Sequence, residues 1–166
     1  RIALVSGGGR GIGRGISELL AAEGAAVAVN YRRDRDAAEE TVEAIVAAGG
    51  TARAYEASVD DAAACASMVE QVVADLGGLD LLVCNAGIAS KGRAVADTDP
   101  DEMIRVVTTH AFGPHHLSRV SLPHLFNEPL QFDKAAGRVG WSRTADGVRI
   151  ALEELRFATP HTSGTA

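Results

Sequence analysis

The sequence predicts a doubly wound α/β fold, in which helices cover both faces of a parallel β-sheet. Short apolar runs alternate with longer segments of helical periodicity between residues 2 and 84, and paired glycines separate several of them. Strands that are apolar along their whole length are typical of parallel sheets buried on both faces. The segments between these runs are long enough to serve as right-handed helical crossovers.

The strands are expected where the apolar runs occur. The first run, Ile2 to Val5, leads into a glycine-rich turn, and the last, Leu79 to Cys84, follows Gly77-Gly78. Short apolar runs bounded by such turn signals favour buried strands. The four expected strands are residues 2–5, 27–29, 51–57 and 79–84.

The helices are expected between these strands. Residues 36–48 end at Gly49-Gly50, which is a helix stop signal, and place Ala38, Val42 and Ile45 on one face. The helix before the fourth strand is expected to begin with Asp60 as its N-cap. The helix after the first strand is indicated by apolar residues at helical spacing: Ile12, Ile16, Leu19 and Leu20.

A longer helix is expected to begin at Asp99 and to continue toward Leu125. Asp99 suits the N-cap and Pro100 the first helical position. Gly113-Pro114 predicts a kink or a break, because proline has no amide hydrogen and clashes with the preceding turn. The expected buried stripe is Met103, Val106 and Val107, and the acidic side chains of Asp97, Asp99, Asp101 and Glu102 are interpreted as helix capping.

The composition changes after Leu125. Four of the seven aromatic residues of the chain, Phe126, Phe132, Trp141 and Phe157, lie in the last 41 residues. The alternation of strand and helix stops there, although Val148, Leu152 and Leu155 have the spacing of a short helix. We therefore divide the chain into residues 1–125 and a segment of different character, residues 126–166.

The overall composition excludes several classes of function. A formal net charge of −6 over 166 residues does not favour binding to nucleic acid or to an anionic membrane surface. No apolar run approaches the ~18 residues that a membrane helix needs, and the two cysteines have no metal-site spacing. We expect a soluble, cytoplasmic protein without a metal, and we interpret His110, His115, His116 and His124 as exposed or interface residues.

A glycine-rich turn between the first strand and helix is the main functional signal. It reads Ser6-Gly7-Gly8-Gly9-Arg10-Gly11-Ile12-Gly13 and would bring backbone amides to an anion at a helix N-terminus. A pyrophosphate is the expected ligand. A nucleoside-triphosphate loop is excluded because Arg14 and Gly15 stand where lysine and serine or threonine are required, and the G-x-G-x-x-G spacing is not met either.

The turn resembles the Thr-Gly-x-x-x-Gly-x-Gly loop of the short-chain dehydrogenase/reductase family, with Ser6 in place of threonine. Cys84-Asn85-Ala86-Gly87 is similar to the family's Asn-Asn-Ala-Gly motif. The resemblance covers residues 1 to about 125 and is nearest to the branch of 3-oxoacyl-acyl-carrier-protein reductases. It implies a Rossmann-type NAD(P)-binding domain, a small-molecule carbonyl or alcohol substrate, and a homo-oligomer formed through the long helix.

The end of the second strand indicates which dinucleotide is bound. It reads Asn30-Tyr31-Arg32-Arg33, without the carboxylate that NAD-binding domains place on the ribose, so NADP is favoured over NAD. The alternative is that Arg32, Arg33 and Arg35 form a solvated loop with Asp34 and Asp36. With the positions that the resemblance assigns to the adenine and the ribose, the expected cofactor contacts are Ser6, Gly7, Gly9, Arg10, Gly11, Ile12, Gly13, Asn30, Arg32, Arg33, Ser58, Val59, Asn85, Ala86 and Gly87.

The catalytic residues that the resemblance implies are missing. The family uses Tyr-x-x-x-Lys, whereas the only tyrosines are Tyr31 and Tyr55 and the only lysines are Lys91 and Lys134. His110 stands where the family has a catalytic asparagine. Residues 137–139 resemble the start of the family's fifth strand, which leads to a catalytic serine, and Ser142 follows them. No catalytic residue is assigned, and His110 and Ser142 are the remaining candidates.

Three hypotheses follow from these observations. The protein is an NADP-dependent oxidoreductase by descent, a non-catalytic NADP-binding protein, or a fragment without a stable fold. A truncated or frame-shifted product whose reductase sequence is lost near residue 126 accounts for the abrupt end of the pattern.

Overall fold

The computed structural model describes residues 1–125, 134–144, 147–158 and 163–165. The chain divides into two compact units, Arg1–Asn127 and Glu128–Ala166, which are described separately. No helix in the described ranges is long and apolar enough to cross a membrane.

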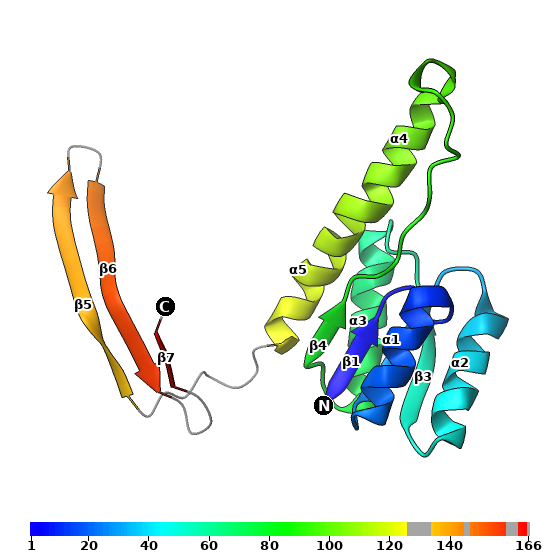
Figure 1. The fold of residues 1–166 in the computed structure, drawn as a ribbon, viewed down its shortest axis with the longest axis horizontal. Coiled ribbons are helices and arrows are strands. Elements are labelled where there is room, and N and C mark those ends of the chain that lie inside the picture. The colour runs from blue at the N-terminus through cyan, green and yellow to red at the C-terminus, as the bar shows by residue number, and fades with distance from the viewer. Residues whose placement is uncertain (126–133, 145–146, 159–162, 166) are drawn as a thin grey trace. The chain divides into compact units, whose positions relative to one another are not determined.

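The first unit is built on a four-stranded parallel sheet with the order β3-β2-β1-β4 (Figure 1). The strands are β1 (Ile2–Val5), β2 (Ala26–Tyr31), β3 (Thr51–Glu56) and β4 (Leu81–Val83). The first three helices are α1 (Gly11–Ala22), α2 (Arg35–Ala47) and α3 (Ala62–Leu76). The predicted doubly wound α/β class and its strand–helix alternation are confirmed.

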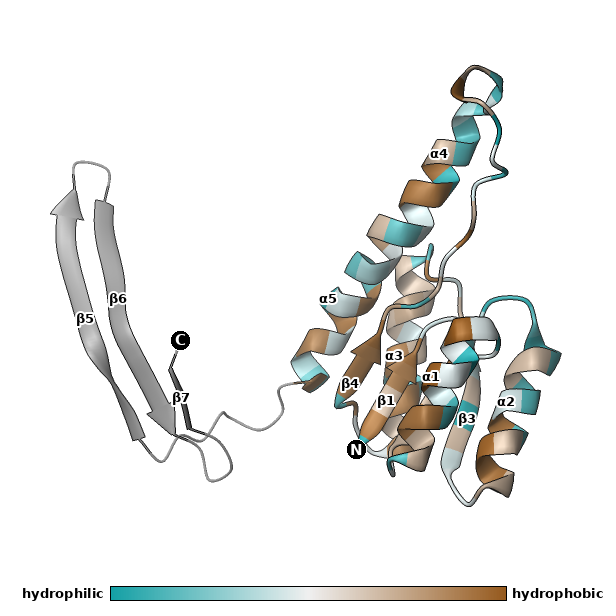
Figure 2. Cartoon of the chain, viewed as in Figure 1, coloured by the Kyte–Doolittle hydropathy of each residue, from teal (hydrophilic) through white to brown (hydrophobic). Residues whose placement is uncertain are grey.

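Two hydrophobic clusters, one on each face of the sheet, form the core of this unit. One cluster joins Val5, Val27 and Val29 to residues of α1 and α2, including Ala38 and Ile45. The other joins the sheet to α3 and to the last helix of the unit, through Leu4, Met68, Val69, Val72 and Leu117. Figure 2 shows β1 and β4 in hydrophobic colours, whereas the helices carry both kinds of residue.

Helix α1 buries only part of the face that its apolar spacing predicts, because Ile16 and Leu20 pack against the core whereas Ile12 and Leu19 do not. Its buried residues are the small Gly13, Ser17 and Ala21, while Ile12 and Leu19 are 79% and 64% exposed. Small side chains allow the helix to approach the glycine-rich turn and the sheet closely, so size decides which face is buried. The predicted N-cap of α3 is also wrong by one residue, because Asp61, not Asp60, accepts hydrogen bonds from the first-turn amides.

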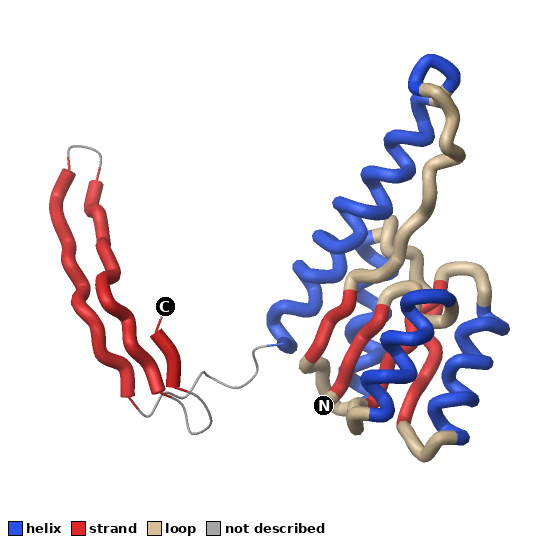
Figure 3. Tube along the Cα trace, in the orientation of Figure 1, coloured by secondary structure: helices blue, strands red, loops and turns tan. Residues whose placement is uncertain are grey.

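The long helix passes Gly113-Pro114 without breaking. Helix α4 (Pro100–Val107) continues through a π-helical turn, Thr108–Phe112, into α5 (Gly113–Leu125), and Figure 3 shows one uninterrupted helical path. A proline has no N–H to donate, and a widened turn lets the helix pass it. The predicted buried stripe is wrong at two positions, because Met103 and Val107 are 66% and 40% exposed.

The second unit contains a three-stranded antiparallel sheet of β5 (Lys134–Thr144), β6 (Gly147–Ala158) and β7 (Ser163–Thr165). The short helix expected around Leu152 is wrong, because this segment lies in β6. Val148, Ile150 and Leu152 repeat every two residues, which is the period of a strand. Residues 137–139 lie in β5, which pairs antiparallel with β6 and so does not continue a parallel sheet.

Candidate functional site

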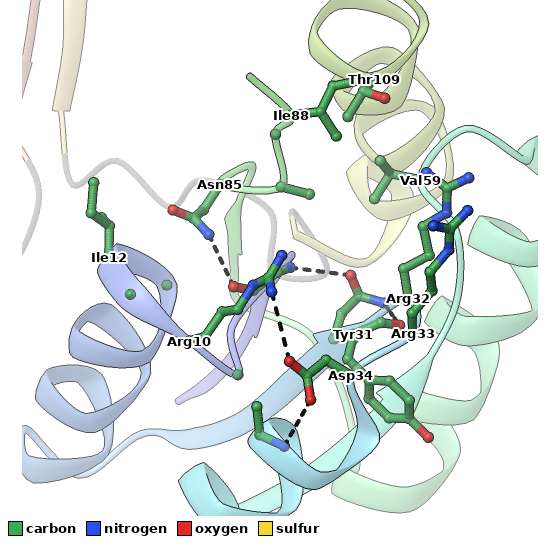
Figure 4. Close-up of a pocket in the computed structure, with 18 of the residues that line it drawn as sticks. Arg10, Ile12, Tyr31, Arg32, Arg33, Asp34, Val59, Asn85, Ile88 and Thr109 are labelled. Carbon is green, nitrogen blue, oxygen red and sulfur yellow. Dashed lines mark hydrogen bonds and ion pairs between the residues drawn. The ribbon is translucent and has the colours of Figure 1, made fainter. Parts of the chain in front are cut away.

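A cleft of about 840 Å³ opens at the carboxyl ends of the parallel strands, where ligands bind in open α/β sheets. Of the predicted cofactor contacts, only Ser6 and Ser58 lie outside its lining. The sheet therefore brings together four predicted segments that are far apart in the sequence (Figure 4). The lining is Gly7, Gly9–Gly13, Asn30–Asp34, Ala37, Ala57, Val59, Asn85–Ile88 and Thr109.

Ser6 joins the glycine-rich turn to the segment that follows β4. Its side chain is buried, and its Oγ accepts hydrogen bonds from the amides of Asn85 and Ala86 at 2.9 and 3.0 Å. The Asn85 side chain donates in return to the carbonyls of Ser6 and Gly7 at 2.9 and 3.1 Å. The two sequence motifs thus form one hydrogen-bonded unit.

Asn30 at the end of β2 supports the same turn from beneath. It is 2% exposed, and its Oδ1 accepts a hydrogen bond from the Gly7 amide at 3.2 Å. Its Nδ2 donates to the carbonyls of Ala57 and Tyr55 at 3.1 and 3.2 Å. The side-chain amide is therefore used within the protein, and Asn30 shapes the cleft by holding the turn and the end of β3.

Two hydroxyl groups that the sequence analysis missed also hold the turn. Ser17 Oγ on α1 lies 2.9 Å from the Gly13 carbonyl and 3.2 Å from that of Gly8. Thr41 Oγ1 on α2 donates to the Gly9 carbonyl at 2.9 Å. Both residues are fully buried. A polar residue on the buried face of a helix beside the turn was the signal that could have found them.

The N-terminus of α1 is free to bind an anion. The side chains of Asp34, Asp61 and Asp99 cap α2, α3 and α4, whereas Arg10 at the N-cap of α1 makes no side-chain cap. Gly11 has a φ of +54°, and its α-carbon faces open space. The first-turn amides and the positive end of the helix dipole therefore meet the cleft without a side chain that caps them, which fits a pyrophosphate.

Glycine is required at position 13 for packing. An added Cβ would lie 2.1 Å from the carbonyl oxygen of Gly7 and 2.5 Å from the Asn85 side-chain nitrogen. The helix therefore starts in direct contact with the turn.

Guanidinium groups gather at the end of the cleft formed by the loop after β2. Arg32 pairs with Asp60 at 3.0 Å, and Arg10 pairs with Asp34 at 3.6 Å (Figure 4 draws the second pair). Arg33 lies beside Arg32 in the lining. Arg35 does not line the cleft, and it pairs with Glu39 on α2. The solvated-loop alternative thus describes Arg35, whereas Arg10, Arg32 and Arg33 line the cleft.

The expected adenine position combines an apolar wall with an unused hydroxyl. Val59 is 5% exposed and lines the cleft. Ser58 Oγ is buried and has no hydrogen-bond partner, which is uncommon for a buried hydroxyl. This hydroxyl lies outside the cleft lining, so of the two expected adenine contacts only Val59 faces the cleft.

His110 holds the segment after β4 and lies outside the cleft lining. Its Nε2 is 2.8 Å from the Ile88 carbonyl oxygen and 3.1 Å from the Ile88 amide nitrogen. Its ring packs on Gly87, where an added Cβ would lie 2.7 Å from Cε1. Ser142, the other catalytic candidate, lies in β5 of the second unit. Within the described residues, no three histidine, cysteine or acidic side chains gather as metal ligands do.

Glu102 anchors the loop between β4 and α4. It is buried, and its Oε1 accepts hydrogen bonds from the Ser90 hydroxyl at 2.5 Å and the Lys91 amide at 2.8 Å. These bonds favour the carboxylate and lower the pKa of Glu102. The interpretation of this residue as a helix cap is therefore wrong, although Asp99 does cap α4.

The sequence profile of the family described as short chain dehydrogenase matches residues 1–139. The chain belongs to this family. A versicolorin reductase of Emericella nidulans is 41% identical over 125 residues, which are 75% of this chain and 47% of that protein. A trihydroxynaphthalene reductase of Colletotrichum orbiculare is 37% identical over 125 residues, 75% of this chain and 44% of that protein. The chain thus spans about half the length of these relatives.

Solved structures of short-chain dehydrogenases show the same fold. One from Burkholderia cenocepacia, in complex with NADP, has a TM-score of 0.71 at 37% identity, covering 74% of this chain and 50% of its own. A 3-ketoacyl-ACP reductase from Sinorhizobium meliloti has a TM-score of 0.71 at 35% identity, with coverages of 75% and 49%.

Proposed function

We propose that residues 1–125 form a domain that binds NADP and that the protein is an oxidoreductase acting on a small-molecule carbonyl or alcohol. The observation that supports this best is the cleft itself. It combines an uncapped helix N-terminus under a glycine-rich turn with three arginines at one end. Bound NADP supplies a hydride donor or acceptor. Its pyrophosphate fits the amides around Gly11 and Ile12, and a 2′-phosphate fits Arg10, Arg32 and Arg33.

The remaining contacts follow from the same placement. Val59 and Ser58 would border the adenine, and Asn85, Ala86 and Gly87 would border the ribose on the nicotinamide side. The carboxylate-free strand end favours NADP over NAD, and one of the similar structures contains NADP. The names of the relatives support a carbonyl substrate, and the resemblance favours the 3-oxoacyl-acyl-carrier-protein reductase branch. The exposed Met103, Ile104 and Val107 would support a homo-oligomer formed through the long helix.

A second candidate function is NADP binding without turnover. Neither tyrosine offers a free phenol: Tyr31 donates to Glu56 at 3.3 Å, and Tyr55 donates to Asp75 at 3.1 Å. Burial and the Asp75 carboxylate raise the pKa of Tyr55 to about 12. A phenol with a raised pKa is poorly matched to proton transfer near neutral pH. We therefore propose no catalytic residue in residues 1–125, and we regard residues 126–166 as a segment without the family's catalytic motif.

Calorimetric titration of the full chain with NADPH and with NADH tests the cofactor proposal. We expect NADPH to bind about tenfold or more tightly, because guanidinium–phosphate contacts are strong charge-assisted bonds. Arg33→Ala should weaken NADPH binding and leave NADH binding unchanged, whereas Arg35→Ala is the matched control outside the cleft. Equal affinities for the two cofactors would contradict the choice of NADP, and no binding of either would contradict the function itself. Oxidation of bound NADPH by a carbonyl compound separates the two candidate functions.

A further inference from the structure

Asp60 joins three elements at the arginine end of the cleft, although it does not line the cleft itself. Its Oδ2 lies 3.0 Å from Nη1 of Arg32, which follows β2. Its Oδ1 accepts a hydrogen bond at 2.8 Å from the hydroxyl of Thr109 in the π-helical turn. Because both carboxylate oxygens have partners, Asp60 has a fixed orientation, and Arg32 is tied through it to the long helix.

The other ion pair of the cleft, between Arg10 and Asp34, is longer and more exposed to solvent. Arg10 and Asp34 are 80% and 51% exposed and lie 3.6 Å apart, so water competes for both side chains. Arg32 and Asp60 are 48% and 24% exposed, and their contact is short. A guanidinium has five N–H donors, so a contact with Asp60 leaves Arg32 donors for a ligand. Arg32 is therefore the arginine whose position the protein fixes.

We propose that Asp60 is a positioning residue that holds Arg32 for the 2′-phosphate of the cofactor, with Thr109 fixing the carboxylate. This inference rests on the proposed function, because it concerns the group that distinguishes NADP from NAD. Holding a long side chain in place before binding removes part of the entropy loss on binding, which corresponds to about threefold to tenfold in affinity. The carboxylate contacts Arg32 from outside the cleft lining, and the proposal requires that fixing the position of Arg32 gains more affinity than repulsion of the phosphate by Asp60 costs.

The test compares two probes, adenosine 2′,5′-bisphosphate and adenosine 5′-monophosphate, by calorimetry on the full chain. The ratio of their affinities measures the contribution of the 2′-phosphate without any turnover. In Asp60→Ala, we expect the preference for the bisphosphate to fall about threefold to tenfold while monophosphate binding stays unchanged. Asp60→Asn should recover most of the preference, because its amide can accept from Arg32 and donate to Thr109.

Several results would overturn the proposal. An unchanged or increased preference in Asp60→Ala would mean that the carboxylate competes with the phosphate, and an equal loss for both probes would mean a structural role. Retention of the preference in Arg32→Ala would also refute it, while the proposed function would stand on Arg10 and Arg33. A wild-type protein without any preference would instead refute NADP specificity. Should Asp60→Ala fail to fold, Thr109→Val carries the test through the ratio of the two affinities, because Thr109 itself lines the cleft. The ratio of bisphosphate to monophosphate affinity should fall about twofold to threefold, and an unchanged ratio would refute the proposal.

Discussion

The replacement of Asn30 by alanine tests whether the cleft depends on the buried amide beneath it. Asn30 is 2% exposed, accepts from the Gly7 amide at 3.2 Å and donates to the Ala57 carbonyl at 3.1 Å. Alanine removes both the acceptor and the donor. It leaves the backbone groups of the glycine-rich turn and of the segment after β3 without these partners.

The size of the effect follows from these two bonds. The hydrogen bond to the Ala57 carbonyl is buried, and a buried polar group left without a partner costs about 1–3 kcal/mol. The Gly7 amide is part-buried and lines the cleft, so the loss of its bond adds only about 1 kcal/mol. A domain of this kind has about 5–15 kcal/mol of stability in total. We therefore expect Asn30→Ala to lower the free energy of unfolding by a large fraction, and to weaken adenosine 5′-monophosphate binding because Gly7 is no longer held.

Urea unfolding of the full chain measures this change, with a shift of the midpoint at a constant slope expected. Asn30→Asp is the matched control, because it keeps the shape and the acceptor but replaces the donor. Burial should raise the pKa of the new carboxyl above its unfolded value near 3.9. The protonated carboxyl can donate to the Ala57 carbonyl, so at low pH the variant should have a free energy of unfolding near that of wild type. This stability is lost as pH rises through the raised pKa. A loss below about 1 kcal/mol in Asn30→Ala, or an Asn30→Asp variant without this pH dependence, would refute the reasoning.

Three further predictions concern the packing of the turn and the segment after β4. Gly13→Ala should destabilise the fold by about 1–3 kcal/mol or more, because its Cβ would meet the Gly7 carbonyl at 2.1 Å; an unchanged urea midpoint would contradict this close contact. His110→Gln should raise the free energy of unfolding by about 0.5–1 kcal/mol, because a side-chain amide can bond both the N–H and the carbonyl of Ile88, whereas one ring nitrogen bonds only one of them. His110→Ala is the control in the same unfolding assay. A His110→Gln variant no more stable than His110→Ala would exclude this pairing. The pKa of Glu102 is lowered in the folded protein, so its stabilisation of the loop is present above the unfolded-state pKa and is lost as pH falls through the folded-state pKa. Hydrogen exchange at the Lys91 amide should therefore show reduced protection at acid pH. Glu102→Gln should abolish this pH dependence of protection. A Glu102→Gln variant with the wild-type pH dependence would assign the change to another group.

The fold was predictable because its strongest signals are local. The apolar runs, the glycine stops and the Asp99-Pro100 helix start each depend on a few neighbouring residues, and the structure reproduces them. The errors occur where contacts between elements decide. Ile12 and Leu19 have helical spacing but are exposed, because α1 must approach the turn with its small residues. The sequence also shows a proline that should interrupt the long helix, but it does not show that a π-helical turn accommodates it.

The sequence predicted which residues surround the cleft, but it did not predict the hydrogen bonds that each of them makes. The motif spacing indicated which residues surround the cleft, and the sheet brings them together. Apart from those of Ser17, the hydrogen bonds that hold them join residues 23 to 80 positions apart, as for Gly7 with Asn30 and Ser6 with Ala86. No periodicity or propensity reports such pairs. For this reason Thr41 was missed, and Asn30 was interpreted as a ligand contact although its amide supports the backbone. Ser17 bonds residues only four and nine positions away, and it was missed because the apolar spacing of α1 does not mark a serine as buried.

The hydrogen bonds that shape the cleft lie within the first unit, so nucleotide binding can be tested independently of substrate turnover. Every hydrogen bond that holds the glycine-rich turn to Asn30, Asn85 and Thr41 is made within Arg1–Asn127. The cleft therefore needs no residue of Glu128–Ala166 for these contacts. The segment that carries Asn85 follows β4, one of the two edge strands of the four-stranded sheet, whose residues are only half-buried. If the alternative of an unstable fragment is correct, hydrogen exchange should be fastest at β4 and should spread from there to Asn85 and the turn. If the domain is stable, nucleotide should protect both segments whether or not the protein turns over a substrate.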